Sequence, residues 1–126
     1  MNCLFCELPK KRIVLENEFF VVIRDGYPIS KGHSLLIPKR HVSSLFDLNF
    51  DEFHLLRTTL SQSKKELDGE YHPDSYNIGI NDGEQAGQTI SHLHIHLIPR
   101  YIGDQEDPKG GVRWIFPEKA DYWSKS

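Results

Sequence analysis

The chain has 126 residues, of which 38% are hydrophobic and 26% charged, a composition typical of one globular domain with its own core. Its net charge of −3 disfavours wholesale binding to nucleic acid or to a membrane surface, although a local cluster of His, Lys and Arg could still hold a small polyanion. No apolar run approaches the roughly 20 residues that cross a bilayer, and the start "MNCLFCELPKKR" lacks the regions of a signal peptide. We therefore expect a cytoplasmic, single-domain protein without nucleic-acid or membrane partners.

Two cysteines, Cys3 and Cys6, form a C-x-x-C pair near the start. Without an export signal, this spacing indicates reduced thiols with metal or redox chemistry, not a disulfide framework. A thioredoxin-like redox pair needs a preceding strand, and only two residues precede Cys3. The remaining interpretations are two ordinary thiols, or half of a structural zinc site that histidines from elsewhere complete.

Three strands are expected before the histidine-rich segment. The apolar, β-branched segments 19–25 and 33–39 predict strands, and the turn-forming "GYPISKG" lies between them. Residues 76–81 predict a further short strand, followed by the glycine-containing loop 82–88. We find no internal linker or domain boundary.

Residues 49–71 predict the one long helix. Asn49, with Glu52 three residues later, resembles an N-terminal capping box, although Asn is not its usual first residue. Four apolar residues recur at helical spacing and are expected on one buried face: Phe53, Leu56, Leu60 and Leu67.

The segment 101–126 carries Gly, Pro and charge and predicts an irregular tail. Four aromatic residues are expected to anchor it: Trp114, Phe116, Tyr122 and Trp123. Strands with mostly hairpin-like connections and one long helix predict an α+β fold with an antiparallel sheet.

The segment "SHLHIHLIPR", residues 91–100, places three histidines in strict alternation with apolar residues. In a helix, successive histidines would lie ~200° apart and could not converge. A strand over 91–98 puts His92, His94 and His96 on one face, with their rings ~6.6 Å apart in succession. One zinc ion cannot take all three rings from one extended strand, so at least one ring is free for other work.

Histidine suits catalytic work because its ordinary pKa of ~6.5 leaves a large neutral, nucleophilic fraction at neutral pH. The alternative is that the rings are merely solvated residues on a polar sheet face. Isolated histidines, such as His54 and His72, are assigned to that alternative.

The pattern His92-Leu-His94-Ile-His96-Leu-Ile matches the signature of the histidine triad superfamily. The segments "CLFC", "GHSLLIPKRH" (32–41) and "NDGEQAGQT" (81–89) occur in the order seen in that family, so the resemblance covers roughly residues 3–100. It implies a single domain over 1–126 with a sheet of about five antiparallel strands, one long helix and a short one. It also implies a homodimer in which two sheets join edge to edge.

The resemblance implies nucleotide hydrolysis or nucleotidyl transfer through a covalent nucleotidyl-histidine intermediate. By position, His94 is similar to the nucleophile, His96 to the partner that binds phosphate oxygen and assists the leaving group, and His33 to a supporting histidine. Imidazole is both a fair nucleophile and a fair leaving group, which agrees with these roles.

The resemblance also implies a set of nucleotide contacts. Asp25 matches a carboxylate that binds ribose hydroxyls, although it could equally be a turn residue beside Gly26. The positions that match phosphate contacts are Asn81, Gly87, Gln88 and Thr89, and those that match the base pocket are Leu4, Phe5 and Ile23. The loop itself lacks the G-K-[ST] of a P-loop and could be an ordinary hairpin turn.

In zinc-bearing relatives, the cysteine pair is joined by a histidine after the "IPK" strand and by the first histidine of the triad. The implied structural zinc site therefore consists of Cys3, Cys6, His41 and His92, a closed Cys₂His₂ set. A zinc ion there would leave His94 and His96 for chemistry.

Within the superfamily, the short segment after the cysteines and the long continuation after the triad resemble bacterial relatives of diadenosine polyphosphate hydrolases. Arg100, Lys109 and Arg113 could then reach distal phosphates, or could be surface charges. We therefore expect AMP release from an adenylated substrate such as a dinucleoside polyphosphate. The alternatives are an adenosine phosphoramidate hydrolase, a zinc-stabilised nucleotide-binding module without significant turnover, and a metalloenzyme that uses the His92–His94 pair.

Overall fold

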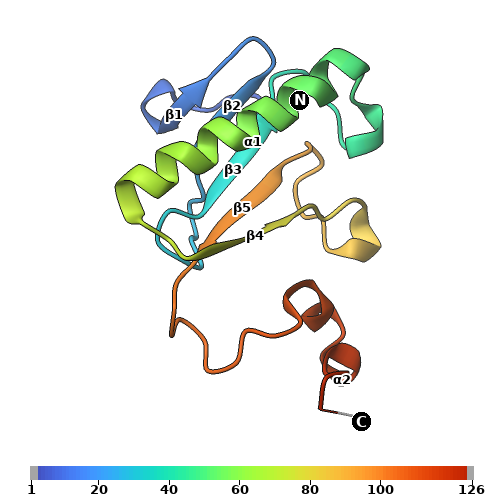
Figure 1. Ribbon diagram of the computed structural model, residues 1–126. Coiled ribbons are helices and arrows are strands. Elements are labelled where there is room, and N and C mark those ends of the chain that lie inside the picture. Colours follow the sequence, from blue (N-terminus) through green and yellow to red (C-terminus); the bar gives the residue numbers. More distant parts are fainter. Residues whose placement is uncertain (1–2, 125–126) are drawn as a thin grey trace.

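The structure is a computed structural model that describes residues 3–124. Its five strands form one antiparallel sheet in the order β1-β2-β3-β5-β4. The strands are β1 (Ile13–Glu16), β2 (Phe20–Arg24), β3 (Ser34–Pro38), β4 (Ser75–Gly79) and β5 (Ile95–Arg100). Helix α1 (Phe50–Tyr71) crosses one face of the sheet, and the short helix α2 (Pro117–Ala120) lies in the tail (Figure 1). The predicted α+β architecture is confirmed, and no helix within residues 3–124 is long and apolar enough to span a membrane.

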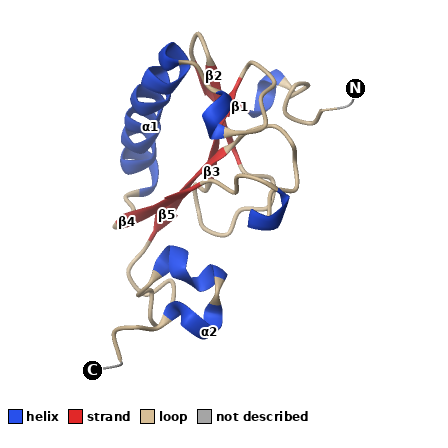
Figure 2. Ribbon diagram, turned by 90° about the vertical axis from the view of Figure 1, so that its right-hand side faces the viewer, coloured by secondary structure: helices blue, strands red, loops and turns tan. Residues whose placement is uncertain are grey.

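Both faces of the sheet are covered, which explains why β2 and β3 are almost continuously buried. One cluster lies between the sheet and α1 and includes Phe20, Leu36 and Leu67. The other lies on the opposite face, where the N-terminal segment packs Cys3 and Phe5 against the sheet. Figure 2 shows α1 on one side of the sheet and the N-terminal segment on the other.

The N-terminal end of α1 is fixed as predicted. The Asn49 side chain accepts a hydrogen bond from Glu52 N, and the Glu52 carboxylate accepts one from Asn49 N, so the capping box is confirmed. Glu52 is only 2% exposed and is neutralised by Arg40, whose Nε and Nη2 donate to its two oxygens at 3.0 and 2.7 Å. This ion pair ties α1 to the chain just after β3.

The predicted buried face of α1 is wrong at Phe53, which is 55% exposed. The buried residues are Glu52, Leu56, Thr59, Ser63 and Leu67. At 100° per residue, Phe53 lies about 80° from the centre of that stripe. Because three of the five buried positions are polar, the apolar pattern alone misplaced the face.

Two strands differ from expectation. β1 was not predicted, because it is a four-residue edge strand with a register irregularity that leaves too little alternation to detect. β5 begins at Ile95 and not at residue 91, so only His96 of the three histidines lies in a strand. The chain before Ile95 leaves β3 and bonds elsewhere, with Leu93 N donating to Val42 O at 2.7 Å.

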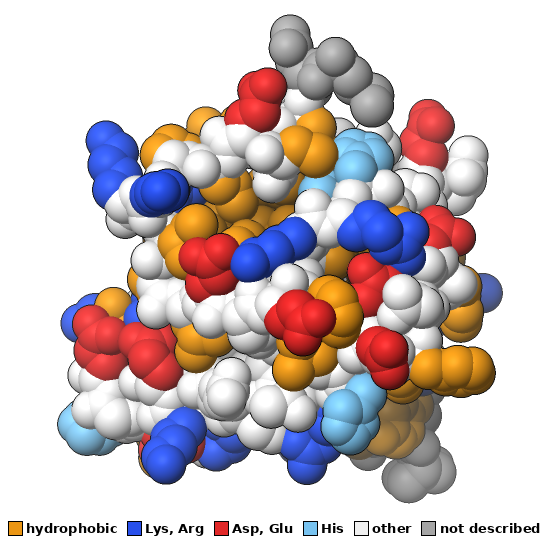
Figure 3. Space-filling view, turned by 90° about the horizontal axis from the view of Figure 1, so that it is seen from above, with side chains coloured by type: hydrophobic (Ala, Val, Ile, Leu, Met, Phe, Trp, Pro, Cys, Tyr) orange, Lys and Arg blue, Asp and Glu red, His pale blue; other side chains and the backbone are white. Residues whose placement is uncertain are grey.

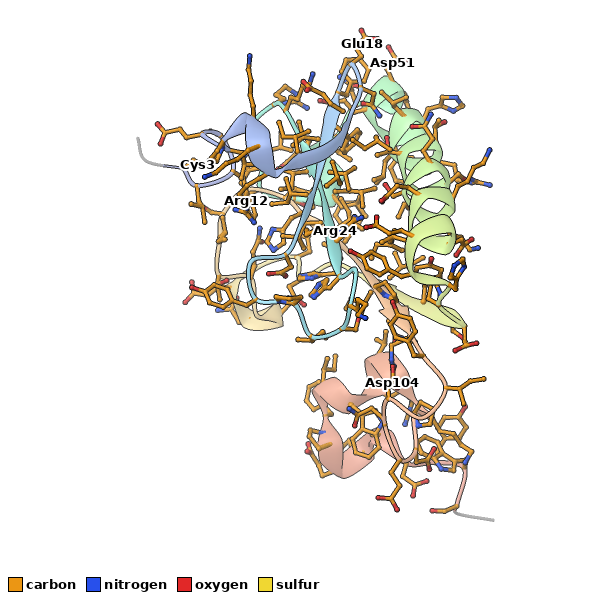
Figure 4. All side chains as sticks on the ribbon, turned by 90° about the vertical axis from the view of Figure 1, so that its left-hand side faces the viewer. Cys3, Arg12, Glu18, Arg24, Asp51 and Asp104 are labelled. Carbon is orange, nitrogen blue, oxygen red and sulfur yellow. The ribbon has the colours of Figure 1, made fainter. Side chains whose placement is uncertain are left out.

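The tail runs away from the sheet (Figures 1 and 4). Its aromatic residues do not anchor it to the core, contrary to expectation, because Trp114, Phe116 and Tyr122 are 46%, 56% and 62% exposed. They pack within the tail, where Trp123 contacts the rings of Trp114 and Tyr122.

Candidate active site

The histidine-rich segment presents its rings to the face of the sheet opposite α1. The apolar residues that alternate with the rings are each 1% exposed and belong to the core beneath the helix: Leu93, Ile95 and Leu97. The rings instead meet the N-terminal segment, where Phe5 packs edge-on to His94 with 5.0 Å between ring centroids. The ring centroids of His94 and His96 lie 5.3 Å apart. Core packing on one face therefore fixes the rings on the other.

The hydrogen bond of His94 defines its protonation. Its Nδ1 lies 2.9 Å from the carbonyl oxygen of His92. A carbonyl oxygen only accepts, so Nδ1 carries the proton and donates it. In the neutral ring, Nε2 then holds a lone pair with no partner among the described residues, which is the requirement for a nucleophile.

His33 and His96 form a relay that begins at the main chain. Ile29 N donates to His33 Nδ1 at 3.2 Å, so the proton of neutral His33 resides on Nε2. That Nε2 lies 2.9 Å from His96 Nδ1 and 3.4 Å from Asp25 Oδ2, both of which accept. His96 Nδ1 is therefore an acceptor, and its own proton lies on Nε2. We call His33, His96 and the Ile29 N–H the histidine relay.

The environment keeps the relay neutral. Burial lowers the pKa of His33, against the opposing influence of the Asp25 carboxylate. Burial also lowers the pKa of His96, and the neighbouring His33 and His94 lower it further. Neutral rings hold the alternating donors and acceptors that the relay requires. The site thus pairs a bare nitrogen on His94 with an N–H on His96.

The four predicted zinc ligands lie together beside Phe5, whose ring centroid is 6.1 Å from that of His92. The ligand atoms of Cys3, Cys6, His41 and His92 are all within 4.8 Å of one another. His92 Nδ1 is 3.4 Å from Cys3 Sγ and 3.5 Å from Cys6 Sγ, and His41 Nδ1 is 3.1 Å from Cys6 Sγ. The second nitrogen of His92 donates to Pro38 O at 2.7 Å, which leaves Nδ1 free to bind a metal. The donor set and the oriented imidazole fit a structural zinc ion.

The relay residues lie within a wide cavity between the sheet and the tail. It has a volume of about 1470 Å³, and its lining includes Asp25, His33, His96 and Asn81 from the body and Trp114 from the tail. His94 is not part of this lining, so the cavity adjoins that ring through its neighbour His96. Figure 4 shows Cys3 in the body of the molecule, beside the N-terminal segment, and Asp104 at the start of the tail, so the candidate metal site lies away from the tail.

The cations expected to reach distal phosphates all have partners within the tail. Arg100 donates twice to the Asp104 carboxylate at 2.8 Å, which lowers the pKa of Asp104 to about 2. Lys109 pairs with Asp107 at 3.5 Å. Arg113 donates to two main-chain carbonyls at 2.6 and 2.9 Å. None of the three is a free cation in the described chain.

The remaining predicted nucleotide contacts differ in accessibility. Asn81 and Thr89 are exposed, and Gly87 occupies the left-handed region at φ 97°. Phe5 is 8% exposed, whereas Leu4 is 62% exposed. Ile23 is completely buried in the same core cluster as Phe5, so its side chain is not accessible to a ligand.

Comparison with known proteins identifies the family. A family model described as the HIT domain matches residues 7–103. The chain belongs to the HIT family. The matched range begins after Cys6, so it does not include the cysteine pair of the candidate zinc site.

The relatives of this HIT protein include named enzymes. An uncharacterized HIT-like protein of Methanocaldococcus jannaschii is 38% identical, over 86% of this chain and 87% of its own length. The adenosine 5'-monophosphoramidase hnt1 of Schizosaccharomyces pombe is 31% identical, over 94% and 90%. A bis(5'-adenosyl)-triphosphatase of Saccharomyces cerevisiae is 31% identical over 92% of this chain and 54% of that longer protein.

One similar solved structure of the same family is described as zinc-bound. It is a Zn-bound histidine triad family protein from Mycobacterium smegmatis, similar to this chain with a TM-score of 0.73 and 35% identity, over 83% of this chain and 79% of the other. The predicted HIT-like fold is thereby confirmed.

Several groups that shape this HIT site carry no sequence signal. The Ile29 N–H and the Pro38 carbonyl set the tautomers of His33 and His92, and main-chain groups leave no mark on residue identity. The segment after His41 was not predicted to contribute, yet Val42 accepts a hydrogen bond from Leu93 between the histidines. These contacts become visible only when the folded chain brings the distant segments together.

Proposed function

We propose that this protein hydrolyses adenylated substrates at the α-phosphate and releases AMP. The observation that carries the proposal is the opposite protonation of neighbouring rings, with a lone pair on His94 Nε2 and a proton on His96 Nε2. One ring can attack phosphorus while the other donates a hydrogen bond to the departing atom. The hydrolase names of two relatives support the same class of reaction.

The reaction proceeds in two displacements. His94 Nε2 attacks the α-phosphorus, and the bond to the leaving group breaks with its electron pair on the leaving atom. His96 Nε2–H donates a hydrogen bond to that atom as negative charge develops there, and an amine leaving group takes up one proton from solvent. Water then attacks phosphorus, the P–N bond electrons return to His94, and the proton of the water passes to solvent. The Nδ1–H bond to His92 O holds the His94 ring in place through both steps.

The nucleotide contacts follow from the positions around the relay. Asp25 binds the ribose hydroxyls, and Asn81 contacts phosphate from the rim of the cavity. The N–H groups of Gly87 and Gln88 donate to Glu84 O and Gly83 O and shape the loop, and the loop contacts phosphate through Thr89. Phe5, supported by Ile23, packs against the base.

Zinc has a structural role in this proposal. Cys3, Cys6, His41 and His92 would hold the ion and tie the N-terminal segment to the histidine segment. The metal supplies no catalytic chemistry, because four protein ligands leave no open position for substrate.

The leaving group distinguishes two substrate classes. A dinucleoside polyphosphate needs cations for its distal phosphates, and Lys31 is the cavity-lining cation without an ion pair in the described part of the chain. A phosphoramidate has an amine leaving group that needs no such cations. Arg100, Lys109 and Arg113 are all paired with groups of the tail, and this observation supports an adenosine phosphoramidate as the second candidate substrate. Both share the chemistry at the α-phosphate.

A homodimer is part of the proposal. β4 is an edge strand whose Ile78 is 53% exposed, and such edges are usually covered in native proteins. Ile102 and Ile115 of the tail are 89% and 75% exposed. A second copy that pairs along β4 would cover these side chains, and light scattering after size-exclusion chromatography would measure the mass.

Figure 3 shows acidic and basic side chains interspersed on the upper face, without a continuous basic patch there.

The direct test is AMP release from diadenosine triphosphate and from an adenosine phosphoramidate by wild type and His94→Ala. The proposal expects release by the wild type alone, with the ratio of the two kcat/KM values identifying the preferred leaving group. If both proteins bind nucleotide and neither releases AMP, the proposed hydrolase activity is refuted and a nucleotide-binding module without turnover is favoured.

A further inference from the structure

The loop between β4 and the histidine segment is held together by one of its own side chains. Gln88 Oε1 accepts a hydrogen bond from Gly83 N at 2.9 Å. Its Nε2 donates to Ser43 O at 2.9 Å and to Ile90 O at 3.0 Å. The carboxamide thus closes the loop at Gly83 and fastens it to the segment that follows β3.

A second side chain fastens the same loop to the same segment. The Asp82 carboxylate accepts hydrogen bonds from Ser44 Oγ and Leu45 N, both at 3.0 Å. Two residues before Ser44, Val42 O accepts from Leu93 N between the histidines. The segment therefore joins the loop to the nucleophile, and it begins at the candidate zinc ligand His41.

These bonds leave the side chain of Gln88 no free donor. A carboxamide has two N–H donors, and both are used on main-chain carbonyls. The next residue is different, because neither the N–H nor the hydroxyl of Thr89 has a partner in the described chain, and Thr89 is exposed. The loop thus offers donors at Thr89 while Gln88 holds its shape.

We propose that Gln88 is a positioning residue for the hydrolysis proposed above, and that its side chain orders the loop without binding phosphate. The cross-link holds the Thr89 donors at a fixed place relative to His94. This inference rests on the proposed function, because it assigns the ordered loop to the phosphate of that reaction. Misplacing such donors by about 1 Å can cost on the order of 100-fold in rate.

The test compares Gln88→Met with Gln85→Met in the full-length protein. Met preserves the side-chain length at position 88 and removes all three hydrogen bonds, whereas Gln85 is an exposed residue of the same loop with no side-chain hydrogen bond among the described residues. Amide exchange at Gly83 is measured without nucleotide, and kcat and KM for AMP release are measured on the better of the two substrates above.

The inference expects Gly83 exchange to become at least about tenfold faster in Gln88→Met only, because its N–H loses its acceptor. It expects kcat to fall about 10- to 100-fold while KM changes less than about threefold. Unchanged exchange with lost turnover would show that Gln88 contacts substrate directly and would overturn the inference. Faster exchange with full turnover would overturn it too. A wild type without turnover would refute the proposed function itself, whatever the exchange rates.

Discussion

His96 should matter in proportion to how poor the leaving group is. The relay runs from the Ile29 N–H through His33 to His96 Nδ1, so the only proton of neutral His96 lies on Nε2. His96 lines the cavity, where the leaving group would lie. Losing one donor that stabilises developing negative charge costs about 10²- to 10³-fold in kcat, or roughly 3–4 kcal/mol of transition-state free energy.

The assay compares His96→Ala with wild type on two substrates that differ only in the leaving group. We expect a loss of about 100-fold or more for an adenosine phosphoramidate of an alkylamine, and of less than about tenfold for the p-nitrophenyl ester of AMP, whose phenolate departs without assistance. His54→Ala, at an exposed helix position, is the matched control and should behave as wild type. Equal losses on both substrates would refute the assignment of His96 to the leaving group.

Three further outcomes follow from the structure. Burial lowers the pKa of both relay histidines, so the unfolded chain takes up protons before the folded chain as the pH falls below about 6.5. The free energy of unfolding, measured in urea at saturating zinc, should therefore decline from about pH 7 to pH 5, and less steeply in His33→Gln than in wild type. Equal slopes for the two proteins would contradict this. Metal analysis should find about one zinc per chain in protein purified without added zinc and well under half of that in Cys3→Ser, with a lower melting temperature, whereas unchanged metal and stability would exclude the site. Arg40→Met should cost about 2 kcal/mol of unfolding free energy because it strands the buried Glu52 carboxylate, while Lys65→Met on the exposed helix face should cost less than about 0.5 kcal/mol; equal costs would show that the pair is not stabilising.

Local patterns in the sequence predicted the features that depend on neighbouring residues. The capping box at Asn49 and Glu52 is such a feature, since both partners lie within one helical turn. The alternation around His94 is another, because burial of every second residue fixes the opposite face. The candidate zinc ligands came from the family resemblance, and the structure brings them together although His92 is 86 residues from Cys6.

Features that depend on the packing of distant segments could not be predicted in this way. Phe53 fits an apolar stripe, yet the buried stripe includes polar residues that bond across the fold. Strand β5 begins late because Leu93 pairs with Val42, far away in sequence. Arg100 has the charge that phosphate binding needs, but the folded tail commits it to Asp104. Residue type indicates what a side chain can do, and only the fold determines which partner it meets.

The most direct test of the mechanism is to capture the covalent intermediate on His94. A reaction of wild type with excess adenosine phosphoramidate would be quenched in base within milliseconds, because P–N bonds to histidine break in acid, and analysed by mass spectrometry. We expect one adenylyl group on the peptide that contains His94, and none in His94→Ala. AMP release in wild type with no adduct at any quench time, and with inversion of configuration at a chiral α-phosphorus, would show direct attack by water and would contradict the nucleophilic role of His94.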